Sequence, residues 1–389
     1  MTSLAYGSEQ ATLFGDDDPG LVSRENPEYL SRQLVTYLGN KRSLSQNLER
    51  AILEIRSRVG GRQLAAADLF AGSGFVTRLL KQHSSFLLAN DLEAYSAVVN
   101  ACYLADRDDE VDAEVRAVVA ALNERADSGE TCSGFIRDLY SPADDKNIQL
   151  GERVFYTNDN ARRLDLFAQE IAHLEEPIRT QVLAPLLSRA SMHANTSGVF
   201  KGFYKDKHTG IGKFGAAAGD ALSRILAPIR LESPVSSNFR AETAVTRSDA
   251  NAAVSGMPEV DLVYLDPPYN QHPYGSNYFM LNLLVDYQRP DDFSKVSGIP
   301  TDWNRSGYNV KKRALPLMID LFDRVPARFV LVSFNAEGYI RTDELRAAME
   351  EHGRVDEVVM PYNTFRGSRN LRGRSIHVNE HLFLLDRRG

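Results

Sequence analysis

Apolar residues follow two patterns along this chain: short continuous runs and longer stretches with helical spacing. The runs Leu64–Phe70, Phe86–Ala89 and Leu262–Leu265 are short and continuous, so they predict buried strands. Two further strands are predicted at Phe329–Phe334 and His381–Leu385. Continuous apolar runs of this length are typical of strands covered on both faces of a sheet.

Helical spacing appears between these runs. Residues 44–58 place five apolar side chains on one face: Leu44, Leu48, Ala51, Ile52 and Ile55. Helices are also predicted over residues 75–82 and 94–126, with helical pieces between residues 162 and 192. The order strand, glycine turn, helix, strand over residues 64–89 predicts a β-α-β unit and therefore a parallel sheet.

The strand pattern is interrupted in the middle of the chain. We predict one α/β domain built from residues 29–105 and 245–389, with a helical and irregular region, residues 106–244, inserted into it. Residues 1–28 are polar and contain the acidic run Asp16–Asp18, which predicts a loose N-terminal tail.

Composition is that of a soluble globular protein with a sizeable core: 389 residues, 43% hydrophobic and 25% charged. No apolar run approaches the length of a membrane helix, and the N-terminus lacks a secretory signal pattern. The two cysteines, Cys102 and Cys132, form no CxxC pair, so we expect no metal site and a reducing, cytoplasmic setting. A net charge of −7 excludes a uniformly basic surface but not a nucleic acid ligand.

The segment DLFAGSG, residues 68–74, has the features of a cofactor-binding turn. Asp68 ends a predicted strand, and Gly72 and Gly74 let the backbone approach a ligand closely. A dinucleotide fingerprint would require glycine at position 77, where this chain has Thr77, so a pyrophosphate ligand is not favoured. Asp91 ends the next strand, where a carboxylate can accept hydrogen bonds from two ribose hydroxyls.

The segment DPPY, residues 266–269, directly follows the third apolar run, at the edge where open α/β sheets bind ligands. Asp266 and the Pro267 carbonyl are acceptors, and Tyr269 supplies a flat ring. Two acceptors beside an aromatic face suit a planar NH2 group on a base. When both amine N–H groups donate hydrogen bonds to these acceptors, the nitrogen lone pair is drawn out of conjugation with the base. Stacking of the base on the Tyr269 ring contributes about 1–3 kcal/mol to binding.

Five motifs, in order, resemble the D12-type adenine-N6 DNA methyltransferases of the α group: YLGNK (37–41), DLFAGSG (68–74), YLDPPY (264–269), LVSFNAEG (331–338) and YNTFRGSRN (362–370). The resemblance covers about residues 30–385 and is weakest in the insertion. It implies a Rossmann-like fold that uses S-adenosylmethionine, with the insertion as target-recognition domain. The implied reaction methylates the N6 of an adenine flipped out of double-stranded DNA.

The resemblance also implies roles for individual residues. Tyr37 and Lys41 would line the methionine end of S-adenosylmethionine, with Lys41 facing its carboxylate, and Asp91 would hold the ribose. The turn would border the methionine end through its residues, among them Asp68, Phe70, Gly72 and Gly74. Asp249 is a candidate contact to the cofactor's adenine, with a turn or cap acid as the alternative. Asp266, Pro267 and Tyr269 would act on the target base, and Asp266 would also border the cofactor.

Two basic segments are candidate DNA contacts. The first contains Lys201, Lys205, Lys207 and Lys213 among glycines, and the second contains Arg366, Arg369, Arg372 and Arg374. A cognate restriction endonuclease is a possible functional partner, and an orphan methylase is the other setting. Two other functions remain open at this point: an RNA methyltransferase acting on an exocyclic amine, and a catalytically inactive DNA-binding relative.

Overall fold

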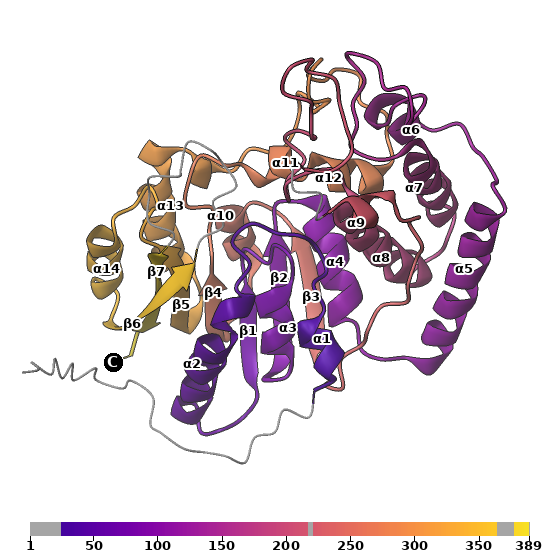
Figure 1. Cartoon of the computed structure of the whole chain (residues 1–389). Coiled ribbons are helices and arrows are strands. Elements are labelled where there is room, and N and C mark those ends of the chain that lie inside the picture. The colour runs from indigo at the N-terminus through magenta and orange to yellow at the C-terminus, as the bar shows by residue number, and fades with distance from the viewer. Residues whose placement is uncertain (1–24, 217–220, 364–376, 389) are drawn as a thin grey trace, which may run out of the picture.

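A seven-stranded sheet forms the centre of the molecule in the computed structural model, which describes residues 25–216, 221–363 and 377–388 (Figure 1). The spatial order of the strands is β3-β2-β1-β4-β5-β7-β6. Their bounds are β1 Leu64–Asp68, β2 Ser84–Asp91, β3 Glu242–Arg247, β4 Val260–Leu265, β5 Ala327–Asn335, β6 Arg354–Asn363 and β7 His377–Asp386.

The predicted parallel sheet is confirmed for β1 to β5, whose neighbours pair in parallel. The sheet is mixed, however, because β7 runs antiparallel between β5 and β6. The sequence prediction missed β3 and β6, which are the two edge strands. Their sequences, ETAVTR and RVDEVVMPYN, mix charged and apolar residues because one side of each strand has no neighbour.

Successive residues of the central strands point to opposite faces of the sheet. On β4, Leu262 and Tyr264 belong to one core cluster, whereas Val263 and Leu265 belong to the other. The first cluster is covered by α2 (Ser45–Arg58) and α3 (Phe75–Lys81), and the second by α13 (Lys311–Arg324) and α14 (Thr342–Glu350). The continuous apolar runs of the sequence are explained by this burial on both faces.

Helices cover both faces and fill the inserted region. The remaining helices of the α/β part are α1 Pro27–Ser31, η1 Arg42–Leu44, α4 Ala94–Leu104, α10 Ala250–Ala253, η2 Val254–Gly256, α11 Tyr274–Asn277, α12 Phe279–Asp286 and η3 Gly307–Asn309. Those of the inserted region are α5 Asp109–Asp127, α6 Phe135–Tyr140, α7 Asn158–Ile171, α8 Ile178–His193 and α9 Leu222–Leu226. All five apolar residues predicted for one face of residues 44–58 are buried.

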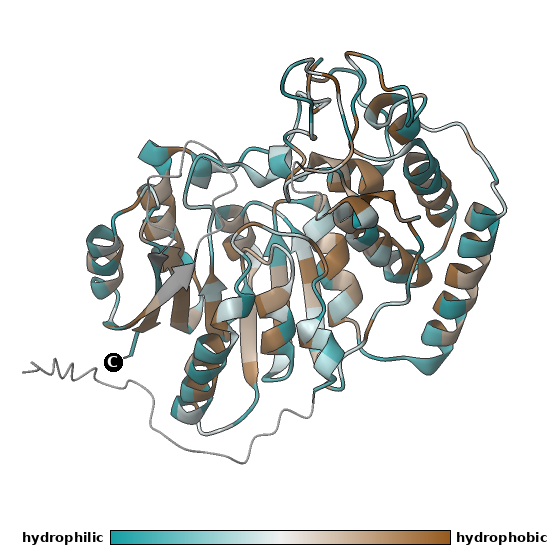
Figure 2. Ribbon diagram, viewed as in Figure 1, coloured by the Kyte–Doolittle hydropathy of each residue, from teal (hydrophilic) through white to brown (hydrophobic). Residues whose placement is uncertain are grey.

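The inserted helices pack against the α/β part through one shared core. α8 contacts both α4 and α12, and most of their buried apolar residues belong to a single cluster. Figure 2 shows hydrophobic residues on the central strands and on the faces of α4, α7 and α8, while α5 and α14 are mainly hydrophilic. The domain boundaries at residues 105 and 245 stay a prediction.

Three predicted boundaries differ from the structure. The helix predicted over residues 94–126 is two helices, because the chain is extended at Ala105 and Asp108 then caps α5 by accepting from two backbone N–H groups. The first strand ends at Asp68, not Phe70. α1 begins at Pro27, inside the predicted tail, most of which lies outside the described residues. No described helix is long and apolar enough to cross a membrane.

Candidate active site

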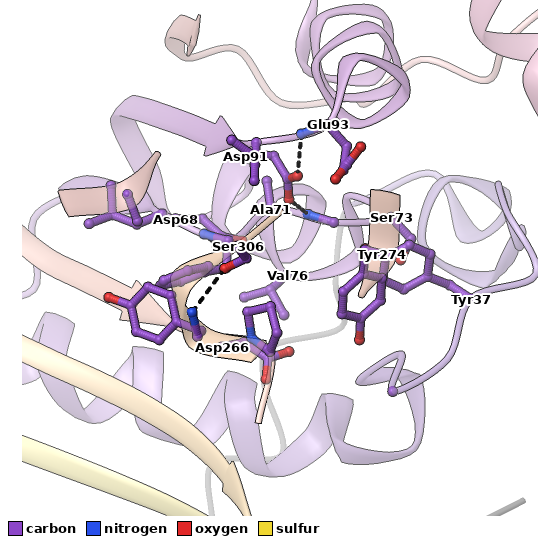
Figure 3. A pocket seen from close by; sticks show the side chains of 18 of the residues that line it. Tyr37, Asp68, Ala71, Ser73, Val76, Asp91, Glu93, Asp266, Tyr274 and Ser306 are labelled. Atoms are coloured by element: carbon purple, nitrogen blue, oxygen red, sulfur yellow. Dashed lines mark hydrogen bonds between the residues drawn. The ribbon is translucent and has the colours of Figure 1, made fainter. Parts of the chain in front are cut away.

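A pocket opens at the carboxyl ends of β1, β2 and β4, where the sequence predicted ligand binding. Its empty volume, including the open mouth, is about 830 Å³. Nearly all of the predicted cofactor residues line it: Tyr37, Lys41, Asp68, Phe70, Gly72, Asp91, Asp249 and Asp266. Residues that lie far apart in the sequence therefore meet at one edge of the sheet, as Figure 3 shows.

The glycine turn after β1 is held in place by Asp91. The Gly72 N–H donates to Asp91 Oδ2 at 2.7 Å, and the Glu93 N–H donates to Asp91 Oδ1 at 2.9 Å (Figure 3). Gly72 has φ +51°, and a Cβ there would lie 3.1 Å from the Tyr37 ring. Gly74 has φ +76° at the N-cap of α3, so both glycines are needed for the shape of the turn.

Asp68 and Phe70 form the floor of the turn. The Phe70 N–H donates to Asp68 Oδ1 at 3.1 Å, and burial raises the pKa of Asp68 well above its usual value. The Phe70 ring meets Tyr308 edge to face, with the centroids 5.1 Å apart. Tyr308 comes from η3, far away in the sequence, and it closes the pocket beside the turn.

Tyr37 lies in a stack of tyrosines on one wall. Its ring is nearly parallel to those of Tyr274 and Tyr278, with centroid distances of 5.0 and 4.9 Å, and its hydroxyl lies 3.2 Å from that of Tyr95. Tyr274 also lines the pocket. The sequence predicted a binding role for Tyr37 but missed the tyrosines that support it, because Tyr95 comes from α4, Tyr274 from α11 and Tyr278 from the junction of α11 and α12.

Lys41 is 5% exposed and lines the pocket. Its Nζ lies 3.0 Å from Asp266 Oδ1 and 2.8 Å from Glu380 Oε1. These two carboxylates keep the pKa of Lys41 above its usual value although burial acts to lower it. Lys41 therefore links the DPPY segment to Glu380, and the contact to the cofactor carboxylate that the resemblance implied stays a prediction.

The DPPY segment leaves β4 at this edge of the sheet. Burial raises the pKa of Asp266 to about 6, Lys41 acts to lower it and Glu380 to raise it. Asp266 and Pro268 line the pocket, and Pro267 is buried between them. Tyr269 packs edge to face on Phe334, with the centroids 6.4 Å apart, and is not among the described residues that line the pocket, so its stacking on the target base stays a prediction.

Asp249 is both a helix cap and a pocket residue, the two alternatives that the sequence left open. It caps α10 by accepting from the N–H groups of Asn251 and Ala252 at 3.0 and 3.4 Å, and it lines the pocket as well. The cap interpretation is therefore confirmed, and a contact to the cofactor's adenine stays a prediction.

Glu93 is the main pocket residue that sequence reasoning missed. Its Oε2 accepts from Asn282 and Asn304 at 2.6 and 3.1 Å, and burial raises its pKa to about 7. Its position two residues after Asp91 was the available signal. Asn304, in contrast, comes from the long segment after α12, and no pattern in the sequence places that segment over the pocket.

The first basic segment forms a hairpin in the inserted region. The Lys213 N–H donates to the Tyr204 carbonyl, and the Asp206 N–H to that of Ile211. The four lysines Lys201, Lys205, Lys207 and Lys213 are exposed. Phe200, next to Lys201, donates its N–H to the Asn277 carbonyl at 2.7 Å, which brings the hairpin's base close to the DPPY side. Arg366, Arg369, Arg372 and Arg374 lie outside the described residues.

Comparisons with known proteins point to the same function as the pocket, the glycine turn and the DPPY segment. Residues 37–347 match the family described as D12 class N6 adenine-specific DNA methyltransferase. The chain belongs to this family. The protein is therefore a DNA adenine methyltransferase, and it is built on a seven-stranded, mostly parallel sheet.

Similar proteins span almost the whole chain. The Type II methyltransferase M.NlaIII of Neisseria lactamica is 28% identical over 366 residues, which is 91% of this chain and 99% of that one. The Type II methyltransferase M.CviAII of Paramecium bursaria Chlorella virus 1 is 27% identical over 360 residues, or 90% and 98%. Modification methylase StsI of Streptococcus sanguinis is 25% identical over 90% of this chain and 52% of its own length.

Proposed function

We propose that this enzyme methylates adenine N6 at specific sites in double-stranded DNA, with S-adenosylmethionine as the methyl donor. The observation that carries the proposal is the meeting of the glycine turn, Asp91 and Asp266 in one pocket. The pocket is lined by the glycine turn, by Asp91 at the end of β2 and by Asp266 directly after β4. A ligand that offers ribose hydroxyls at one end and a reactive group at the other fits this arrangement.

The residues that would hold the cofactor are those of the turn, Asp91 and Glu93, with Asp249 and Ala250 lining the pocket beside the end of β2. When bound, S-adenosylmethionine supplies the methyl group from its sulfonium, and the remainder of the cofactor is left as a neutral thioether. Asp91 is surrounded by donors, the backbone N–H groups of Gly72, Leu92 and Glu93 and the Ser96 side chain, so ribose hydroxyls would compete with some of them for its roughly four acceptor sites. The Tyr37 stack shields this part of the pocket from water.

Asp266 and the Pro267 carbonyl orient the target amine in this proposal. Asp266 Oδ1 faces Lys41, whereas Oδ2 has no hydrogen-bond partner among the residues that the structure describes. An amine hydrogen bonded to Oδ2 has its lone pair directed away from the base ring. Tyr269 supplies a ring on which the base can stack. The target adenine must leave the duplex, which costs a few kcal/mol.

Duplex DNA would lie against the lysine hairpin of the inserted region. A second hairpin, Phe293–Pro300, lies close to the lysine hairpin, because the neighbouring residues Arg153 and Val154 contact one hairpin each. Val154 packs under Gly212 of the lysine hairpin, and Arg153 stacks on Phe293 of the second at 5.0 Å. Val296 at the tip of the second hairpin is 68% exposed, as suits a side chain that contacts a DNA groove.

The names of the relatives support a place in a restriction-modification system. M.NlaIII and M.CviAII are named Type II methyltransferases, and StsI is named a modification methylase. We therefore propose a cognate endonuclease as a functional partner, and a cytoplasmic location. Expressing the chain in a host and sequencing that host's methylated bases tests the base and the site together.

A direct assay separates this function from the alternatives. Purified enzyme is given labelled cofactor with duplex DNA, single-stranded DNA or structured RNA as acceptor. We expect label in duplex DNA, at N6 of adenine. Label confined to RNA would support an RNA methyltransferase, and cofactor-independent DNA binding with no transfer to any acceptor would indicate an inactive relative.

The lysine hairpin leads to a prediction about salt dependence. Changing Lys205 and Lys207 to alanine is expected to weaken duplex binding and to reduce the slope of log affinity against log salt by about 2, since each phosphate contact contributes about 0.9. Equilibrium binding at several salt concentrations measures it. Lys146→Ala, on the loop before α7, is a control, and an unchanged slope in the double variant would place the phosphate contacts elsewhere.

A further inference from the structure

A buried glutamate, Glu380, completes the charge cluster at the catalytic edge of the sheet. It is 2% exposed and lies on β7, paired in register with Asn335 at the end of β5. Because β7 runs antiparallel to β5, its first half lies at the carboxyl edge of the parallel strands, where β4 delivers Asp266. The mixed sheet thus brings a carboxylate from near the C-terminus to the DPPY segment.

Both oxygens of Glu380 have a close neighbour, but only Oε2 accepts a hydrogen bond from a described residue, whereas Oε1 takes part in an ion pair. Asn335 Nδ2 donates to Oε2 at 2.9 Å, and Lys41 Nζ lies 2.8 Å from Oε1. Lys41 Nζ also lies 3.0 Å from Asp266 Oδ1, so one ammonium is shared between two carboxylates. A buried charge without a partner costs several kcal/mol, and a Lys41–Asp266 pair alone would satisfy both charges. The second carboxylate is therefore not needed to neutralise Lys41.

The sharing has two consequences for Asp266. Glu380 holds the ammonium on the Oδ1 side, which leaves Oδ2 open toward the pocket, where the Asp266 side chain is 20% exposed. It also gives the three-residue cluster a formal charge of −1. A fixed negative charge near the target amine stabilises the positive charge that the nitrogen gains as it takes the methyl group.

We propose that Glu380 is a positioning residue for methyl transfer: it anchors Lys41 so that Asp266 presents one free oxygen to the target amine in a cluster of net negative charge. This inference rests on the proposed function. Other groups that act on Asp266 or Lys41 are Asp68 from β1, Tyr264 from β4, and Tyr269 and Tyr274 from the segment after β4.

The pH dependence of the enzyme is the most informative readout. Asp266 must be ionised to accept from the amine, and its pKa is about 6, so transfer by the wild type is expected to fall as the pH drops below about 6. The charge of Glu380 raises the pKa of Asp266. Removing that charge lowers this pKa, so the acid limb must move to lower pH.

The test is Glu380→Gln, which keeps the size of the side chain and removes its charge. We expect kcat to fall on the order of 10- to 100-fold, with the acid limb shifted to lower pH and the cofactor affinity and the KM for DNA unchanged. Glu357→Gln is the matched control. Glu357 is an acid on β6, the strand paired with β7, and its own partners are His381 and Arg346. The control is expected to keep the wild-type kcat and pH profile.

A second variant decides the matter if the first does not fold. Glu380→Asp keeps the charge but withdraws it by one methylene, so kcat should fall while the acid limb stays close to pH 6. Wild-type kcat in either variant, or an unshifted limb in a folded Glu380→Gln, would overturn the inference. If the wild type itself transfers no methyl group to DNA, the proposed function fails and the role of Glu380 fails with it.

Discussion

Replacing Asp266 by alanine is expected to reduce methyl transfer to duplex DNA on the order of 1,000-fold or more while duplex binding is retained. The magnitude follows from removing a charged group that faces the atom on which charge develops. Folding should survive, because Lys41 keeps Glu380 as a partner at 2.8 Å. Single-turnover transfer of labelled methyl groups measures the loss, and gel shift or anisotropy measures DNA binding.

Two controls make the Asp266 result specific. Glu350→Ala removes an exposed acid of α14, which pairs with Arg346 four residues before it, and is expected to leave transfer unchanged. Cofactor affinity of Asp266→Ala should stay within a few-fold of the wild type, since the turn and Asp91 are intact. Turnover near the wild-type rate in Asp266→Ala would remove this carboxylate from the catalytic role.

Replacing Asp91 by alanine is expected to weaken S-adenosylmethionine binding on the order of 100-fold, or about 3 kcal/mol. Asp91 accepts from the backbone N–H groups of Gly72 and Glu93 at 2.7 and 2.9 Å, so its loss leaves two partly buried donors unpaired. Each unpaired donor costs about 1–3 kcal/mol, and the glycine turn loses the contact that shapes it. Calorimetric titration of the cofactor measures the change.

The Asp91 and Asp266 variants form a complementary pair. Asp91→Ala should lose cofactor affinity, whereas Asp266→Ala should lose only transfer. Thermal unfolding of Asp91→Ala checks that the turn alone is affected, because the sheet pairs β1 and β2 through backbone contacts that the substitution does not touch. Cofactor affinity within threefold of the wild type would mean that the ribose is held elsewhere, with Glu93 as the nearest alternative.

Several features followed directly from local sequence. Prolines after an apolar run end a strand whatever surrounds them, so Asp266 could be placed at a strand end. The glycines of the turn and the acids at the ends of β1 and β2 were also found locally, because they end or directly follow short apolar runs. The buried faces of the central strands and of α2 follow from periodicity, which reports burial without knowledge of the partner.

Other features depended on contacts between distant segments. The edge strands β3 and β6 carry mixed sequences, because an edge strand is only half enclosed, and their pairing is decided by the rest of the sheet. Lys41 was placed by its motif, but its orientation was not, since its partners lie 225 and 339 residues away. Asn304 and the tyrosines around Tyr37 had no local signature of a site, whereas Glu93 had only its position two residues after Asp91.

The sequence by itself determined the parallel β-α-β unit, the turn, the DPPY lip and the class of enzyme, because these rest on short motifs whose geometry is set by neighbouring residues. Tertiary structure alone decided that Lys41 is shared between Asp266 and Glu380. The physical reason is that an ion pair forms where the fold brings charges into a buried space, and here an antiparallel strand from near the end of the chain supplies the second carboxylate.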